Sequence, residues 1–198
     1  MRVTSNITLE SITDRFTDSL QLSLNNPKII KHLTARVPYP YTKQDAVEFI
    51  NFCKHMNSEL NSTSNTEKGL YLGIIKNDQL YGCVSIEVLK QPEKYVLGYW
   101  LSEKLWGQGI MTKCVNKVLS YVFDNYPEIK TINSSYYPEN IGSMKILMKN
   151  GFLDDENCKI GTCKRWAWDD EKQDLINQIH DSPSNRVVLC KENFVRLE

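Results

Sequence analysis

The sequence has no excess of charge of either sign and no long apolar run. Lys and Arg together number 24, as do Asp and Glu, so the formal net charge at pH 7 is zero. A general binder of nucleic acid or of membrane surfaces would usually carry a basic excess. No run approaches the roughly 20 apolar residues of a membrane span, and the opening MRVTSNITLE lacks the apolar core of a signal peptide. We expect a cytoplasmic protein, with the nucleus as an alternative, that binds neither membrane nor nucleic acid.

Cysteine and histidine are present without the spacing of a metal site. Six cysteines are scattered along the chain, none in a CxxC pair, and the closest two are Cys158 and Cys163. This pattern predicts free thiols in a reducing compartment and no metal cofactor. The histidines His32, His55 and His180 stand apart in the sequence, so we assign them structural or surface roles.

Hydrophobic periodicity and turn signals predict strands and helices in a mixed order. Strands are expected at 7–12, 70–76, 80–90, 94–102, 129–137 and 186–194. Helices are expected at 14–26, 27–33, 42–56, 109–126 and 138–152. We interpret 57–69 as a polar surface loop and 155–185 as a helical insertion or a long loop. The 198 residues are expected to form one domain, 1–198, of mixed α/β (α+β) class.

Several helix boundaries have local signals. Thr42 is a predicted N-cap, and Asp45 three residues later completes a variant of the capping box. Asn140 can cap the helix predicted at 138–152. Gly151 suits the left-handed position after that helix, with Phe152 folding back onto its last turn.

A glycine-containing turn, LSEKLWGQGIMTKC at 101–114, joins a predicted strand to an amphipathic helix. The first turn of a helix has N–H groups without intrahelical partners, which together carry about half a positive charge. Gly107 and Gly109 would let the backbone approach a phosphate group closely. Alternatively, the two glycines only permit a tight turn. The stretch is not a P-loop, and the dinucleotide fingerprint is incomplete because Met111 and Thr112 follow where another glycine is needed.

Four stretches around this turn follow one another in an order shared with a known family. They are VPYPYTKQDAVEFI (37–50), LGYWLSEKLWGQGIMTKCVNKVLSYVF (97–123), PENIGSMKILMKNGF (138–152) and, more weakly, VVLCKENF (187–194). This order resembles the GNAT superfamily of acyl-CoA N-acyltransferases, in particular the branch of the ribosomal-protein N-terminal acetyltransferases. The resemblance implies a central, mostly antiparallel twisted sheet of about six to seven strands flanked by helices.

The resemblance also implies that acetyl-CoA is the co-substrate and that the glycine turn binds the pyrophosphate of coenzyme A. The strand before the turn would then run beside the pantetheine arm, and the thioester would lie where this strand separates from 129–137. Asn140 would bind the pantetheine arm or act as a plain N-cap. The implied cofactor-binding residues are Tyr99, Trp100, Leu101, Gly107, Gln108, Gly109, Ile110, Met111, Thr112, Asn140 and Ser143.

The implied reaction is direct attack of a neutral amine on the thioester carbonyl. Ser143 is a candidate proton donor to the departing thiolate, or else a plain first-turn serine. Many relatives carry a carboxylate two residues before the Gly of GYWL, where this chain has Val96. Glu87 on the neighbouring strand is our candidate for the catalytic base, and Glu103 is a second; each could instead be a solvated surface carboxylate. The tyrosines that could order a water molecule are Tyr99, Tyr136 and Tyr137.

The expected acceptor is a protein N-terminal α-amine or a small primary amine. An α-amino group has a pKa of about 8 and needs little help to lose its proton, which favours a protein N-terminus over a lysine or a polyamine. The alternative function, kept open by Val96, is a non-catalytic acyl-CoA-binding or interaction module of the same fold. We expect a monomer or a homodimer.

Overall fold

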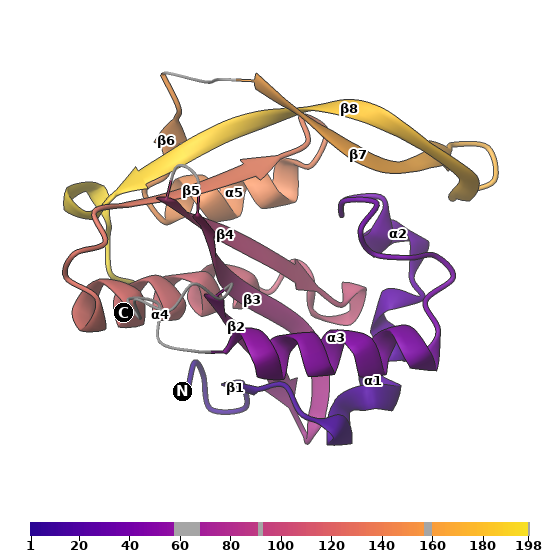
Figure 1. Ribbon diagram of the computed structural model, residues 1–198, viewed down its shortest axis with the longest axis horizontal. Coiled ribbons are helices and arrows are strands. Elements are labelled where there is room, and N and C mark those ends of the chain that lie inside the picture. Colours follow the sequence, from indigo (N-terminus) through magenta and orange to yellow (C-terminus); the bar gives the residue numbers. More distant parts are fainter. Residues whose placement is uncertain (58–67, 91–92, 157–159, 198) are drawn as a thin grey trace.

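The computed structural model describes residues 1–57, 68–90, 93–156 and 160–197 (Figure 1). Most of the predicted polar loop, and also Cys158, lie outside the described residues. The strands are β1 (Thr8–Ser11), β2 (Lys68–Lys76), β3 (Gln79–Lys90), β4 (Glu93–Leu101), β5 (Thr131–Tyr136), β6 (Leu153–Asp154), β7 (Ile160–Asp169) and β8 (Asp174–Cys190). The helices are α1 (Thr17–Leu24), α2 (Pro27–Ile30), α3 (Lys43–Met56), α4 (Ile110–Asn125) and α5 (Ile141–Lys149), with short 3-10 turns η1 (Asp14–Phe16), η2 (Glu103–Leu105) and η3 (Lys191–Asn193).

One sheet connects all the described strands in the order β1-β2-β3-β4-β5-β8-β6, with β7 paired to β8. Neighbouring strands are antiparallel except for β4 and β5, which are parallel. Asn77 and Asp78 both have positive φ and form the tight turn between β2 and β3. The predicted mixed, mostly antiparallel sheet flanked by helices is confirmed, although the described part of the chain holds eight strands rather than six or seven.

The prediction of a helical insertion or long loop at 155–185 is wrong. This stretch forms β7 and most of β8, a long hairpin that arches over the molecule from β5 towards α2 (Figure 1). Burial alternates along β7, where Gly161 is buried and Thr162 and Lys164 are exposed, as a strand with one face on the protein requires. The run DDEKQD favours a helix by composition. Here, however, it makes the hairpin turn, in which Asp169 Oδ1 accepts hydrogen bonds from the N–H groups of Glu171 and Lys172.

Two hydrophobic clusters pack on the opposite faces of the sheet. Helices α4 and α5 cover one face, and α1, α2 and α3 cover the other. Side chains of β4 alternate between them: Leu97, Tyr99 and Leu101 point towards α4, and Trp100 points towards α3. This alternation decides which side chains of the central strands can reach each face of the sheet.

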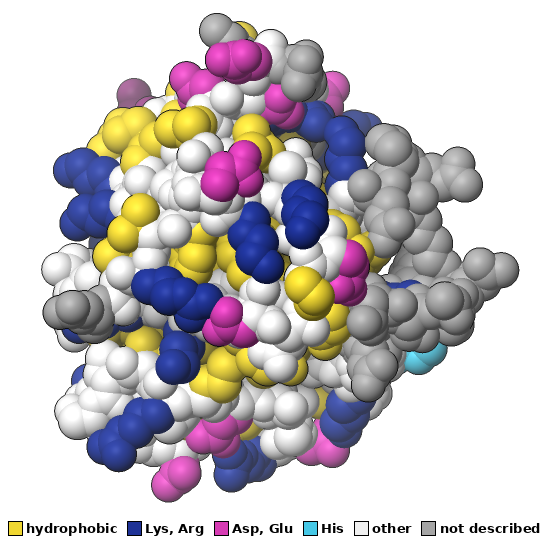
Figure 2. All heavy atoms as spheres, turned by 90° about the vertical axis from the view of Figure 1, so that its left-hand side faces the viewer, with side chains coloured by type: hydrophobic (Ala, Val, Ile, Leu, Met, Phe, Trp, Pro, Cys, Tyr) yellow, Lys and Arg dark blue, Asp and Glu magenta, His cyan; other side chains and the backbone are white. Residues whose placement is uncertain are grey.

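The predicted caps are confirmed, although α1, α2 and α5 are shorter than the ranges predicted for them. Thr42 and Asp45 form a reciprocal capping box at the start of α3. Asn140 caps α5, and Gly151 follows that helix with φ of 87°. None of the described helices combines the length and the apolar character needed to cross a membrane. On the face shown in Figure 2, Lys and Arg side chains are interspersed with Asp and Glu side chains rather than gathered into one basic patch.

Candidate functional site

The site begins where β4 and β5 separate. The two strands share one parallel pair, Val96 with Asn133. Just beyond it, the Ser134 hydroxyl donates to Leu97 O at 3.0 Å. From Gly98 onward β4 pairs only with β3 among the described residues, so the edge of β4 that faces β5 has no strand partner there. A cleft of about 1180 Å³ opens at this point and is lined from both faces of the sheet.

The glycine turn forms one end of the cleft. Gly107 and Gly109 have φ of 74° and 70°, a left-handed conformation that favours glycine. A Cβ added at either position would meet no heavy atom within 4 Å, so the backbone conformation, and not crowding, requires glycine here. Helix α4 starts without a side-chain cap, and the first backbone N–H to find a partner within it is that of Lys113. The preceding N–H groups belong to the cleft-lining residues Ile110, Met111 and Thr112.

Two side chains hold this turn in place. The Trp106 indole N–H donates to Leu101 O at 2.7 Å, and the Gln108 amide donates to Lys104 O at 3.1 Å. Trp106 is 41% exposed and borders the cleft. Gln108 is not among the residues that line the cleft.

Helix α5 contributes a polar wall to the same half of the cleft. The Asn140 side chain accepts from Ser143 N at 3.0 Å, and the Ser143 hydroxyl lies 2.7 Å from the Tyr99 hydroxyl. Tyr99 also donates to Ser143 O at 3.2 Å, so the Ser143 hydroxyl can donate its own proton to Tyr99. Burial raises the pKa of Tyr99, which keeps it a neutral donor at physiological pH. Lys145 and Lys149 line the cleft from the same helix.

Glu87 lies on the opposite face of the sheet, facing α3. It is the direct cross-strand partner of Val96, so the two side chains project from the same face as neighbours. Burial, the charge of Glu87 and a hydrogen bond with Glu87 together raise the pKa of Tyr71, which therefore stays protonated. Both Glu87 and Tyr71 line the cleft. A carboxylate thus stands one strand away from the place where the family's usual carboxylate would be.

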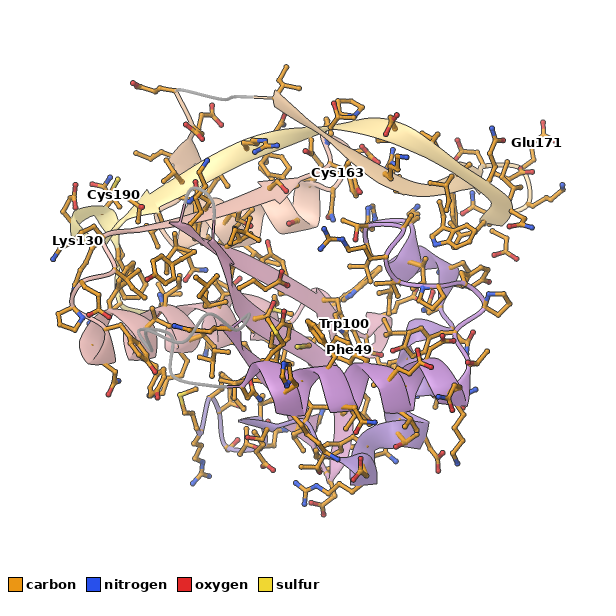
Figure 3. The ribbon with its side chains drawn as sticks, viewed as in Figure 1. Phe49, Trp100, Lys130, Cys163, Glu171 and Cys190 are labelled. Carbon is orange, nitrogen blue, oxygen red and sulfur yellow. The ribbon has the colours of Figure 1, made fainter. Side chains whose placement is uncertain are left out.

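Aromatic rings cover the same half of the cleft. Tyr71 meets Phe49 and Phe52 edge-on, with ring centroids 6.4 Å and 5.2 Å away. Figure 3 shows Phe49 on α3 beside Trp100 on β4, and both pack against the same hydrophobic cluster. All four rings line the cleft.

The β7–β8 hairpin and α2 close the cleft from above, where Figure 3 labels Cys163. Arg165 donates to Ser182 Oγ at 2.8 Å and forms an ion pair with Glu139. Two buried polar atoms in this wall, His32 Nδ1 and Tyr137 Oη, have no hydrogen-bond partner among the described residues. Burial, with the nearby charge of Lys31, lowers the pKa of His32 to about 4, so its imidazole is neutral at physiological pH.

Of the two carboxylates predicted as candidate bases, Glu87 lines the cleft and Glu103 does not. Glu103 lies on η2 and is engaged by Lys28 and Asn26, both at 2.7 Å, outside the cleft described above. The hydrogen bond from Lys28 is the main cause of the lowered pKa of Glu103. Among the described residues, no group of three or more His, Cys, Asp and Glu side chains could hold a metal ion. The sequence does not identify Tyr71, Phe49 or His32 as residues of the cleft. Their only signal is their place in the period-two spacing of a strand or in the spacing of a helix.

Comparison with known proteins gives three likenesses. A Bacillus subtilis (strain 168) protein named Probable N-acetyltransferase YjcK is 30% identical over 98 residues, which are 48% of this chain and 54% of that protein. The match thus spans about half the length of this curated relative. The microcin C7 self immunity acetyltransferase MccE, solved with acetyl-CoA and AMP, has a TM-score of 0.70 at 23% identity, covering 96% of this chain and 95% of that one. RimL, a ribosomal alpha-N-protein acetyltransferase solved with coenzyme A, has a TM-score of 0.68 at 17% identity, covering 96% of each chain.

At these identities the two solved structures show the fold alone. The family itself is shown by sequence, because the profile described as Acetyltransferase (GNAT) domain matches residues 6–153, well over half of the chain. The matched range contains the separated strands β4 and β5, the glycine turn and helix α5. The predicted resemblance to the GNAT superfamily is therefore confirmed, and this chain belongs to the GNAT family of acetyltransferases.

Proposed function

We propose that this chain transfers the acetyl group of acetyl-CoA to a primary amine. The observation that carries the proposal is the gap between β4 and β5, which opens to an uncapped helix N-terminus on one face and to a carboxylate on the other. Membership of the GNAT family and the coenzyme A complex of RimL support acetyl-CoA as the co-substrate.

The α4 face would bind coenzyme A. The N–H groups at Gly109, Ile110, Met111 and Thr112, with the helix dipole behind them, suit the pyrophosphate. Lys145 and Lys149 add positive charge along α5. The remaining residues that we assign to the cofactor are Tyr99, Leu101, Gly107, Gln108, Asn140 and Ser143. Trp100, which the resemblance also assigned to the cofactor, is left out because its side chain lies on the α3 face of the sheet.

Charge that develops on the carbonyl oxygen needs a donor, and the free edge of β4 supplies one. Leu97 O accepts from Ser134 on β5, so the odd-numbered residues of β4 direct their backbone groups towards the gap. The N–H groups of Tyr99 and Leu101 are therefore the proposed donors, and that of Trp100 is directed towards β3. A single donor of this kind is worth about 3–4 kcal/mol in well-studied enzymes.

Proton transfer would use both faces of the sheet. On the α3 face, Glu87 takes the proton that the amine loses as the C–N bond forms, directly or through water. On the α5 face, the Ser143 hydroxyl protonates the sulfur as the C–S bond breaks and regains a proton from water, while the neutral Tyr99 hydroxyl holds Ser143 in place. The short Tyr99–Ser143 contact supports this assignment.

The acceptor that we favour is an α-amine at a protein or peptide N-terminus, with small primary amines as the other class. The test combines two measurements: calorimetric binding of coenzyme A, and release of free thiol from acetyl-CoA with a panel of peptides and amines. We expect binding together with acceptor-dependent thiol release. Tight binding without thiol release on any acceptor would instead favour a non-catalytic acyl-CoA-binding module, and no binding would refute both.

A further inference from the structure

The charged side chains of the cleft are sorted by face. Lys145 and Lys149 line the α5 half, where the phosphates of coenzyme A are proposed to bind. Three carboxylates line the α3 half, those of Asp45, Glu48 and Glu87, and none of them has an ion-pair partner among the described residues.

Few positive charges offset these three carboxylates. Among the described residues, Arg36, on the connector between α2 and α3, is the positively charged residue that lines this half of the cleft. The wall that closes the cleft from above adds no net charge, because Glu139 is paired with Arg165 and His32 is neutral. The acceptor half therefore attracts a protonated amine and repels an acid group.

Apolar surface occupies the rest of the acceptor half. Phe49 and Trp100 are half-buried and Phe52 is 40% exposed, so their rings present accessible faces beside Glu87 and Tyr71. The two phenylalanines lie three residues apart on α3 and stack at 6.3 Å, so they form one continuous surface. Such a surface holds an apolar group by removing both surfaces from water.

The route from this surface to the strand gap is open because of Gly98. Val96, Gly98 and Trp100 are every second residue of β4, so they share one face of the strand. Gly98 is two residues, or about 7 Å, from each of the other two. A Cβ at Gly98 would project into the cleft, 2.9 Å from Ser85 Oγ. An amine at Gly98 would thus have Glu87, the partner of Val96, on one side and the aromatic surface on the other.

We propose that Phe49, Phe52, Tyr71 and Trp100 form a specificity pocket for an apolar or aromatic side chain next to the acceptor amine, within an acidic wall that rejects acceptors bearing a nearby carboxylate. The inference rests on the proposed acetyl transfer and narrows its acceptor. The chemical class is a peptide N-terminus, or an equivalent small amine, whose first side chain is large and apolar.

The test uses the full chain, acetyl-CoA and four peptides that differ only in their first residue: Phe, Leu, Gly or Asp. We expect kcat/KM for the Phe and Leu peptides to exceed that for Gly by about 10-fold or more, in line with the discrimination that apolar pockets achieve. The Asp peptide should fall below Gly by a similar factor. Phe52→Ala and the conservative Phe49→Leu should each reduce the ratio of the rate for the Phe peptide to the rate for the Gly peptide. Glu48→Lys should raise the relative rate of the Asp peptide.

Leu22→Ala is the matched control, because it removes a 70% exposed apolar side chain outside the cleft and should change none of these ratios. Equal rates for all four peptides, or a preference for Asp, would overturn the inference and leave the transferase proposal intact. A preference for Phe that survives both phenylalanine variants would overturn its assignment to this pocket. Failure to acetylate any peptide or amine would refute the proposed function itself.

Discussion

Replacing Glu87 with Gln tests how the amine loses its proton. Gln keeps the size of the side chain and removes its basicity, so folding and coenzyme A binding should be unchanged. Loss of a general base typically costs about 10²–10⁴-fold in rate. An α-amine with a pKa of about 8 is already about one-tenth neutral at pH 7, which places the expected loss at the lower end. We predict that kcat/KM falls about 100-fold at pH 7, or about 2.7 kcal/mol.

The register between β3 and β4 permits a rescue. Because Glu87 and Val96 are direct partners on one face, a glutamate introduced at position 96 projects into the same part of the cleft. The double variant Glu87→Gln with Val96→Glu should recover at least about one-tenth of the wild-type rate. This figure allows for a difference of about one pK unit in basicity between the introduced glutamate and Glu87.

The assay is thiol release from acetyl-CoA with a peptide acceptor between about pH 6 and pH 9. The loss caused by Glu87→Gln should shrink as the pH rises past the pKa of the amine. Glu103→Gln is the matched control, since Glu103 is paired with Lys28 outside the cleft. Full activity of Glu87→Gln at pH 7 would refute the assignment, as would a loss of the same size in Glu103→Gln.

Four further outcomes are expected. Gly109→Asp should abolish coenzyme A binding by calorimetry while leaving the circular dichroism spectrum unchanged, because it adds a negative charge and a side chain at φ of 70°; unchanged affinity would mean that the turn does not hold the pyrophosphate. Ser143→Ala and Tyr99→Phe should each lower kcat about 10-fold and lower it little further together, since Tyr99 acts by holding Ser143 through one hydrogen bond; fully additive losses would contradict that shared role. Asn116→Ala should lower the free energy of unfolding by about 2 kcal/mol in denaturant titration, because it removes the hydrogen bonds to Asn150 Oδ1, Val195 O and Leu197 N; a change below about 0.5 kcal/mol would contradict that role. The pKa of His32 is lowered from 6.5 to about 4, so its contribution to stability is present above pH 6.5 and is lost as the pH falls towards 4. Between these pH values the free energy of unfolding of His32→Gln should fall less than that of the wild type. An identical pH profile for the two proteins would refute this.

The cofactor half of the site could be predicted from sequence because local rules determine it. A glycine turn, the start of an amphipathic helix and an N-cap asparagine are each fixed by a few neighbouring residues. The structure places Gly107, Gly109, Asn140 and Ser143 around one cleft.

The acceptor half could not be predicted in the same way, because it depends on long-range register. Glu87 gains its position only through its pairing with Val96. Tyr71 and Phe49 come together from β2 and α3, which the stretch 58–67 separates in sequence. The β7–β8 hairpin differs from the prediction because charged residues that favour a helix make its turn, and the pairing of β8 with β5 outweighs that preference.

The most direct test of acetyl transfer at the β4–β5 gap is identification of the product. A peptide with phenylalanine as its first residue is incubated with acetyl-CoA that carries a deuterated acetyl group, and the products are fragmented by mass spectrometry. We predict that the deuterated acetyl group is on the α-amine, in an amount equal to the thiol released, and that Gly109→Asp yields neither product. Thiol release without acetylated amine, or an acetylated peptide formed equally well by Gly109→Asp, would contradict the account.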